Sequence, residues 1–158
     1  MSKKIKLTKS KFALIDNSDY KLISKFKWHT HFDGYNYYAA RNVSASKNNG
    51  TRTTISMHVS LLGKIKNKEI DHIDGNGLNN QRKNLRWATH SQNLRNREIQ
   101  SNNKSGYKGV SLHSCGKWRA YCYLNKKQYH LGLFKNKKLA DDAYKNFAQK
   151  HYKQFSKK

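Results

Sequence analysis

The stretch from residue 69 to residue 97 constrains the fold most, because it carries the clearest strand, turn and helix signals in the chain. In residues 68–74 Ile70 and Ile73 alternate with polar side chains, which predicts a strand. Asn76-Gly77 is a strong turn signal, and residues 84–89 predict a second strand after a polar loop. The pattern Thr-x-x-Gln at residues 89–92 is typical of a capped helix N-terminus. The predicted order is therefore strand, loop, strand and helix.

Acidic residues are scarce in this chain, and they are concentrated in the same stretch. Only nine Asp and Glu occur among 158 residues, yet Glu69, Asp71 and Asp74 fall within six positions. Elsewhere Lys and Arg dominate, and the formal net charge is +24. We therefore expect a polyanionic partner, bound with salt-sensitive affinity as nucleic acid is. A ribosomal, membrane-surface or merely soluble basic protein is the alternative.

The length of the chain allows one or two small domains with modest cores. No apolar run approaches the roughly 20 residues that cross a bilayer, and the first ten residues lack the apolar centre of a signal peptide. We expect a cytoplasmic protein without a membrane partner. Cys115 and Cys122 are too few for a four-ligand zinc site of their own, so both are expected to be reduced, with Cys122 in the core.

The region before the central stretch, residues 3–62, is predicted to form short strands and turns with one short helix. Its segment 44–54 is polar and rich in Asn and Gly, so we expect a loop there. Residues 55–63 predict a strand that enters a helical turn. His58 lies in that segment, where a packing or hydrogen-bonding role near the candidate site is expected and direct catalysis is the alternative.

The region after the central stretch predicts a second module. Residues 100–104 lack large apolar side chains and are predicted to be a linker between domains at 1–99 and 105–158. Alternation within 105–134 predicts three antiparallel strands. Residues 137–152 place apolar side chains at helical spacing, which predicts an amphipathic helix over one face of the sheet. The other face should stay exposed, basic and aromatic.

The residue types of the central stretch suit phosphodiester hydrolysis, which needs a base to activate water and a cation to stabilise the leaving oxygen. An aspartate and an amide oxygen, from Asp71 and Asn93, could face each other and hold Mg²⁺. His72 follows Asp71 and should point to the opposite side of the strand, where it could act as the base. Asn84 is the candidate to fix its tautomer by a hydrogen bond. His90 is the alternative to Asn93.

The segment DHIDGNGLNNQRKNLRWATHSQN resembles the HNH nucleases of the ββα-metal fold, in the phage and intron-borne homing branch whose last motif residue is asparagine. The resemblance covers about residues 53–97. It implies an α+β fold in which a small N-terminal sheet leads into a ββα-metal module, and the pattern of the second module adds a three-stranded antiparallel sheet packed on one helix. It also implies Asp71 and Asn93 as ligands of one Mg²⁺ or Mn²⁺ ion per active site, His72 as general base and Asn84 as the residue that orients it.

The motifs YKGV, GKWRA, HLGLF and LADDAYKNFA, within residues 105–150, resemble the DNA-binding domain of plant ethylene-response factors of the Apetala-two type. That resemblance implies a sheet that lies in the major groove of double-stranded DNA. Several arginines and a tryptophan of the plant pattern are replaced here, so the docking mode carries over and the target sequence does not. The implied DNA-binding positions are Lys108, Ser111, His113, Arg119, Tyr121, Tyr123, Gln128 and His130, and Arg86 and Arg97 are predicted to add contacts from the first module.

Together these patterns predict a Mg²⁺-dependent, site-recognising DNA endonuclease of the phage or mobile-element kind. The alternative is a non-catalytic DNA-binding regulator that keeps a degenerate HNH fold. A weaker alternative is an RNA-binding or ribosome-associated protein. Both monomer and dimer remain open.

Overall fold

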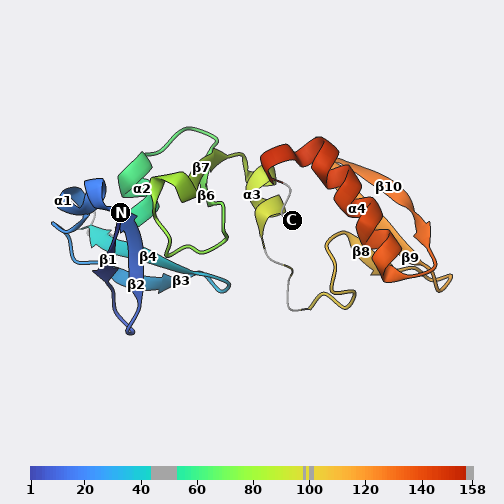
Figure 1. The fold of residues 1–158 in the computed structure, drawn as a ribbon, viewed down its shortest axis with the longest axis horizontal. Helices are drawn as coiled ribbons and strands as arrows, with labels where there is room; N and C mark the ends of the chain where they lie inside the picture. The colour runs from blue at the N-terminus through green and yellow to red at the C-terminus, as the bar shows by residue number, and fades with distance from the viewer. Residues whose placement is uncertain (44–52, 98, 100–101, 156–158) are drawn as a thin grey trace. The chain divides into compact units, whose positions relative to one another are not determined.

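A computed structural model describes residues 1–43, 53–97, 99 and 102–155 of the chain. They form several small antiparallel sheets and a few helices, which is compatible with the predicted α+β class (Figure 1). They divide into two compact units, Met1–Asn93 and Leu94–Lys158. The predicted domain limits stay a prediction, and residues 100–101 of the predicted linker lie outside the described residues.

The first unit begins with an antiparallel hairpin, made of β1 (Ser2–Lys6) and β2 (Phe12–Asp16), in the region where the sequence predicts short strands and turns. Lys9 and Ser10 have φ angles of 55° and 53°, so the chain reverses through left-handed backbone between the two strands. Ile5 pairs opposite Ala13, and both side chains are buried. The alternation of the two strands thus puts one face of the hairpin into the core.

A three-stranded antiparallel sheet and three short helical segments follow. A short helix leads into a strand, within the region where the sequence predicts short strands, turns and one short helix. Helix α2 begins at Met57, so His58 lies on a helix. Of the predicted loop 44–54, residues 44–52 lie outside the described residues, and Thr53 already begins a strand. The elements are η1 (Asn17–Asp19), α1 (Tyr20–Ile23), β3 (His29–Phe32), β4 (Tyr37–Val43), β5 (Thr53–Ser56) and α2 (Met57–Leu62), with sheet order β3-β4-β5.

One hydrophobic cluster joins these elements to the central stretch. Its largest fully buried apolar side chains are Ile15, Ile23 and Met57, and burial of each contributes about 1.5–3 kcal/mol. The cluster consists of Ile5, Leu7, Ala13, Ile15, Ile23, Trp28, Ala39, Met57, Leu61 and Leu85. Because Leu85 belongs to the central stretch, the N-terminal hairpin and that stretch share a core.

The central stretch has the predicted order of strand, loop, strand and helix. Strand β6 (Glu69–His72) pairs antiparallel with β7 (Leu85–Ala88), and helix α3 (His90–Asn96) follows. The connection contains a short 3-10 helix, η2 (Arg82–Asn84). Thr89 N–H donates to Gln92 Oε1 at 2.8 Å and Gln92 N–H donates to Thr89 Oγ1 at 3.3 Å, which is the reciprocal capping that the sequence predicts.

The loop between β6 and β7 is fastened to the N-terminal hairpin. Leu14 N–H donates to the carbonyl oxygen of Leu78 at 2.8 Å, and Asn80 N–H donates to that of Leu14 at 2.7 Å. Arg82 forms an ion pair with buried Asp19, with Nη2 and Oδ1 2.8 Å apart. These contacts give the loop a fixed path although it contains many polar residues.

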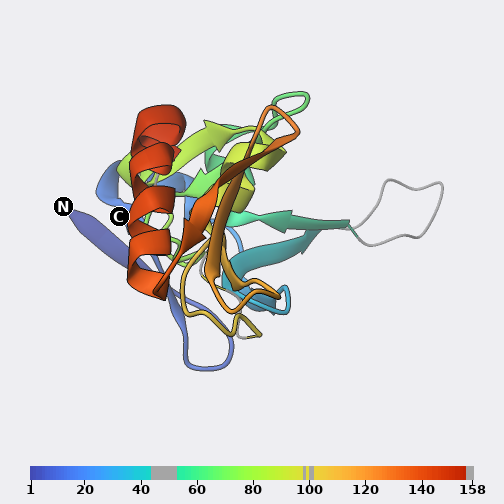
Figure 2. The same ribbon diagram turned by 90° about the vertical axis from the view of Figure 1, so that its right-hand side faces the viewer.

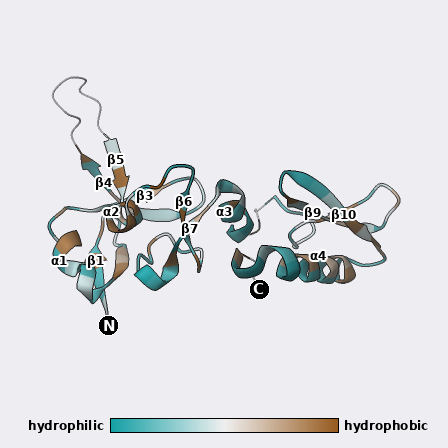
Figure 3. Cartoon of the chain, turned by 90° about the horizontal axis from the view of Figure 1, so that it is seen from above, coloured by the Kyte–Doolittle hydropathy of each residue, from teal (hydrophilic) through white to brown (hydrophobic). Residues whose placement is uncertain are grey.

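The second unit contains the predicted three-stranded antiparallel sheet and amphipathic helix. Strands β8 (Val110–Leu112), β9 (Trp118–Leu124) and β10 (Lys127–Phe134) lie in the order β10-β9-β8. Helix α4 (Lys137–Tyr152) lies along one face of the sheet, and the short η3 (Lys153–Phe155) follows it (Figure 2). Hydrophobic positions occur in short runs between hydrophilic ones in each unit (Figure 3).

The core of the second unit is small. Val110, Ala120 and Ala140 are buried at its centre, and Trp118 and Phe134 pack around them. Cys122 is buried and Cys115 is exposed, and both are free thiols. Among the described helices, none has both the length and the apolar character that a membrane crossing requires.

Candidate active site

The β6–β7 hairpin separates the two adjacent candidate residues onto opposite faces. Asp71 lies opposite Arg86 in the register, and His72 lies opposite Leu85. Both side chains are buried, with exposed fractions of 4% for Asp71 and 6% for His72. The prediction that the imidazole points away from the aspartate is therefore confirmed.

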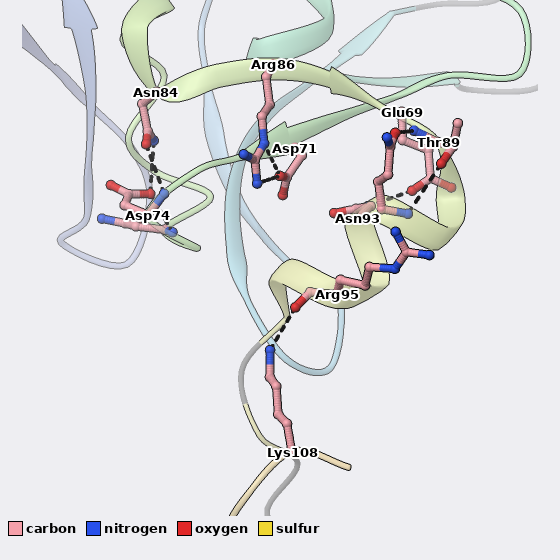
Figure 4. Close-up of polar contacts among 11 residues, drawn as sticks. Glu69, Asp71, Asp74, Asn84, Arg86, Thr89, Asn93, Arg95 and Lys108 are labelled. Atoms are coloured by element: carbon pink, nitrogen blue, oxygen red, sulfur yellow. Dashed lines mark hydrogen bonds and ion pairs between the residues drawn. The ribbon is translucent and has the colours of Figure 1, made fainter. Parts of the chain in front are cut away.

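The buried carboxylate of Asp71 is neutralised by Arg86. The Nε and Nη2 atoms of Arg86 both lie 2.7 Å from Asp71 Oδ2, and the arginine side chain is only 12% exposed (Figure 4). A buried carboxylate needs such a partner, because its transfer from water is otherwise costly. Arg86 was predicted to contact DNA, and the structure pairs it with Asp71. The DNA contact stays a prediction.

Glu69 connects strand β6 to the first turn of α3. Its Oε2 accepts a hydrogen bond of 2.6 Å from Asn93 Nδ2 (Figure 4). Its Oε1 lies 2.7 Å from His90 Nδ1. Glu69 and Asp71 are two residues apart on a strand, so their side chains share a face. Asn93 is therefore hydrogen-bonded to a residue on the same face of β6 as Asp71.

Asn80, and not Asn84, contacts the ring of His72. Asn80 is fully buried, and its Oδ1 lies 3.5 Å from His72 Nε2. Its Nδ2 is directed to the carbonyl oxygen of Gly77, also at 3.5 Å, which leaves the oxygen for the imidazole. The sequence pattern predicts Asn84 for this contact, so the place of Asn80 beside His72 was missed.

Asn84 instead stabilises the loop that precedes it. Its Oδ1 accepts from Asp74 N–H at 3.0 Å, and its Nδ2 donates to Asp74 Oδ1 at 2.9 Å and to the carbonyl oxygen of Asn79 at 2.8 Å. The predicted direct hydrogen bond from Asn84 to His72 is therefore wrong. The reason is the loop path, which brings Asp74 and Asn79 within reach of Asn84 and Asn80 within reach of His72.

Asp74 is held as a carboxylate by this arrangement. Burial raises its pKa, but hydrogen bonds from Asn79, from the Asn76 backbone and from Asn84 outweigh burial and lower the pKa below its usual value. Asn76 N–H donates to Asp74 Oδ1 at 2.8 Å, as expected of the predicted turn role.

The surroundings of His72 keep its imidazole neutral. Burial lowers its pKa below the usual value and outweighs the hydrogen bond to Asn80 and the nearby carboxylates, which raise it. The rings of His58 and Tyr38 lie beside it, with centroids 5.1 Å and 5.8 Å away. A histidine that stays neutral near pH 7 can accept a proton, as a general base must.

His58 is a second buried histidine in contact with the first. Burial, and then the charge of His72, lower the pKa of His58 to about 3. Its Nδ1 is buried and has no hydrogen-bond partner among the residues that the structure describes. The expected packing role near the candidate site agrees with this contact. No sequence spacing shows the contact, because His58 lies on α2 and His72 on β6.

Asp71 and Asn93 suit a hard divalent ion by their chemistry. Because a carboxylate only accepts hydrogen bonds, the Asn93 amide must present its nitrogen to Glu69, and its oxygen remains for another partner. The described residues contain no group of three His, Cys, Asp or Glu side chains suited to a metal. Mg²⁺ nevertheless binds through one or two protein oxygens and retains water, so an aspartate with an asparagine fits it.

Comparison with known proteins finds similarity to HNH endonucleases in this part of the chain. The family model for HNH endonucleases matches residues 60–95. An uncharacterized HNH endonuclease of Acanthamoeba polyphaga mimivirus is 34% identical over 104 residues, which are 65% of this chain and 52% of the viral protein. The chain thus spans about half the length of that relative. No solved structure matches.

The HNH segment, residues 60–95, contains Asp71, His72, Asn84 and Asn93. It also contains Glu69, Asn80 and Arg86, which the structure adds to the site. His58 and Tyr38 lie outside it. The metal-ligand and base roles assigned to its residues stay predictions, as does the resemblance of residues 105–150 to ethylene-response factors.

The second unit brings most of its predicted DNA-binding residues onto one face of its sheet. Register pairs place them opposite one another, and Tyr123, Gln128 and His130 are exposed. Arg119 Nη2 donates to Ser111 Oγ at 3.3 Å, and its guanidinium lies 5.2 Å from the centre of the Tyr121 ring. The paired positions are Ser111 with Arg119, Tyr121 with His130, and Tyr123 with Gln128.

Besides Arg86, three predicted DNA-binding residues lie outside the paired positions of that face. Lys108 Nζ donates to the carbonyl oxygen of Arg95 at 2.9 Å, at the C-terminal end of α3, where a cation is favourable (Figure 4). His113 Nδ1 lies 3.0 Å from Cys115 Sγ in the turn after β8. Arg97 is exposed just beyond α3. DNA contact by these residues stays a prediction.

Proposed function

We propose that this chain is a divalent-metal-dependent endonuclease that hydrolyses phosphodiester bonds in double-stranded DNA. The observation that carries the proposal is the buried, neutral His72 next to Asp71 within the HNH segment. A neutral imidazole beside a carboxylate supplies two of the functions that hydrolysis needs, proton acceptance and cation binding. The strongly basic composition supports a polyanionic substrate.

In this proposal His72 accepts the proton of the attacking water at Nδ1. Asn80 Oδ1 faces Nε2 and holds the proton on that nitrogen, which leaves Nδ1 as the acceptor. Burial lowers the pKa, so the ring is neutral at the pH of the cell. Tyr38 and His58 pack against the ring and restrict its rotation.

Asp71 and Asn93 would hold one Mg²⁺ or Mn²⁺ ion through a carboxylate and an amide oxygen. Such an ion, when bound, stabilises the negative charge that develops on the leaving 3′ oxygen. Arg86 balances the charge of Asp71 and limits its rotation through two contacts of 2.7 Å. Asn84 stabilises the loop between β6 and β7 through its two hydrogen bonds with Asp74.

We further propose that the exposed face of the β8–β10 sheet recognises the target, as expected of a phage or mobile-element homing nuclease. Arginine and tyrosine side chains on one sheet face can meet phosphates and base edges in a groove. The net charge of +24 would add affinity that does not depend on sequence.

The test compares the His72→Ala variant with the wild-type chain on duplex DNA. The variant should bind DNA with unchanged affinity and cleave it at least a hundredfold more slowly, within the range for loss of a general base. Asp71→Ala and Asn93→Ala should shift the Mg²⁺ concentration that gives half-maximal cleavage upwards. Wild-type cleavage by His72→Ala would exclude His72 as the base.

A non-catalytic DNA-binding regulator is the second candidate function. It is favoured by the ion pair between Arg86 and Asp71, because that pair allows the buried carboxylate to serve folding without a metal ion. Incubation of supercoiled plasmid with Mg²⁺ or with a chelator separates the two functions. Relaxation or linearisation that depends on Mg²⁺ identifies the nuclease, and DNA binding without conversion of the plasmid identifies the regulator.

A further inference from the structure

The carboxylate of Glu69 holds two groups at fixed distances. Oε2 accepts from Asn93 Nδ2 at 2.6 Å, and Oε1 lies 2.7 Å from His90 Nδ1. These are short contacts, as expected where a carboxylate takes part. The Glu69 side chain is 40% exposed, so it is not required to fill the core.

An asparagine side chain has two ends that are similar in shape and opposite in function. The oxygen accepts hydrogen bonds or binds a hard cation, whereas the NH₂ group only donates. A free amide can rotate and present either end to a neighbouring site. At Asn93 this freedom is lost, because Glu69 can only accept and must face the nitrogen.

We infer that Glu69 is a positioning residue that orients the Asn93 amide so that its oxygen is available to a divalent ion. The inference rests on the proposed function, in which Asn93 is a ligand. His90 occupies the second oxygen of Glu69 and thereby restrains the carboxylate. The same contact gives His90 a role other than replacing Asn93 as a ligand.

The test measures Mn²⁺ binding to the full chain by electron paramagnetic resonance, which does not depend on cleavage. Glu69→Leu removes the acceptor, and we expect affinity to fall roughly tenfold, the lower end of the range for outer partners of metal ligands. Glu69→Gln keeps an oxygen that can accept from Asn93, so its affinity should stay within about threefold of wild type. Circular dichroism melting checks that both variants fold.

A double-mutant cycle separates positioning from direct metal binding by Glu69. If Glu69 acts through Asn93, then Glu69→Leu should have no further effect on Mn²⁺ affinity in an Asn93→Ala background. A full additional loss in that background would identify Glu69 as a ligand and overturn the inference.

Asp71→Ala serves as the reference variant. If neither Asp71→Ala nor Asn93→Ala changes Mn²⁺ affinity, the proposed metal site is wrong and the inference falls with it. If both weaken binding and Glu69→Leu does not, the metal site stands and only the inference about Glu69 is refuted.

Discussion

The buried pair of histidines should make the first unit sensitive to acid, and His58 allows the effect to be isolated. Its pKa is lowered to about 3 in the folded chain, whereas an unfolded chain has a histidine pKa of about 6.5. Between these values the unfolded chain binds a proton at His58 that the folded chain does not bind. The stabilisation is therefore complete above about pH 6.5 and is lost progressively as the pH falls toward 3.

The magnitude follows from the width of that window. Each pH unit below about 6.5 removes roughly 1.4 kcal/mol, so at pH 5 His58 alone lowers the free energy of unfolding by about 2 kcal/mol. His58→Phe keeps an aromatic ring against His72 and cannot be protonated. Because Nδ1 of His58 has no hydrogen-bond partner within the described part of the chain, the replacement leaves no group there that has lost a hydrogen bond.

Urea unfolding at pH 7.5 and pH 5.0 measures the difference. A Trp118→Phe background leaves Trp28 and Trp87, both in the first unit, as fluorescent reporters. The parent is the Trp118→Phe chain, and His58→Phe is added to it. Between pH 7.5 and pH 5.0 the free energy of unfolding should fall by about 2 kcal/mol less in the His58→Phe variant than in the parent. A matched control, His31→Gln, removes an exposed histidine and should follow the parent. Equal losses in the parent and His58→Phe would refute the claim that His58 is buried uncharged.

Three further predictions concern the loop, its packing and the sheet face. Asn80→Asp places a carboxylate next to His72, which should raise the pKa of the imidazole and move the acid limb of the kcat/KM profile upward by about one pH unit, measured in cleavage assays. Gly77→Ala would put a methyl group 2.5 Å from the Tyr38 ring, and overpacking of this kind should lower the free energy of unfolding by roughly 1–3 kcal/mol in urea titrations. Arg119→Ala should weaken duplex binding and reduce the slope of log affinity against log salt by about one, measured by fluorescence anisotropy.

Local sequence patterns predicted the strands and helices of both units because capping hydrogen bonds, side-chain periodicity and turn residues act between near neighbours in the sequence. The capping pair Thr89 and Gln92 begins α3 where the sequence indicates. Period-two alternation put Asp71 and His72 on opposite faces, and register could have shown Arg86 opposite Asp71. In the second unit Asn125 and Lys126 have φ angles of 51° and 64°, which closes the predicted turn between β9 and β10.

The roles of the individual asparagines could not be assigned from the sequence. Asn79, Asn80 and Asn84 have the same chemistry, and only the path of the loop decides which of them reaches His72. That path is set by hydrogen bonds to Leu14, far away in sequence. The contact between His58 and His72 is equally non-local.

The N-terminal hairpin is therefore part of the candidate site and more than a lead-in to it. Leu14 supplies backbone hydrogen bonds to both Leu78 and Asn80, and Asp16 accepts from Arg82 N–H at 2.8 Å. Ordering the backbone of the loop between β6 and β7 costs about 1–2 kcal/mol of conformational entropy for each residue. The contacts to the hairpin help to offset this cost. Since Asn80 carries a contact to the imidazole, the hairpin helps to position the residue that faces His72.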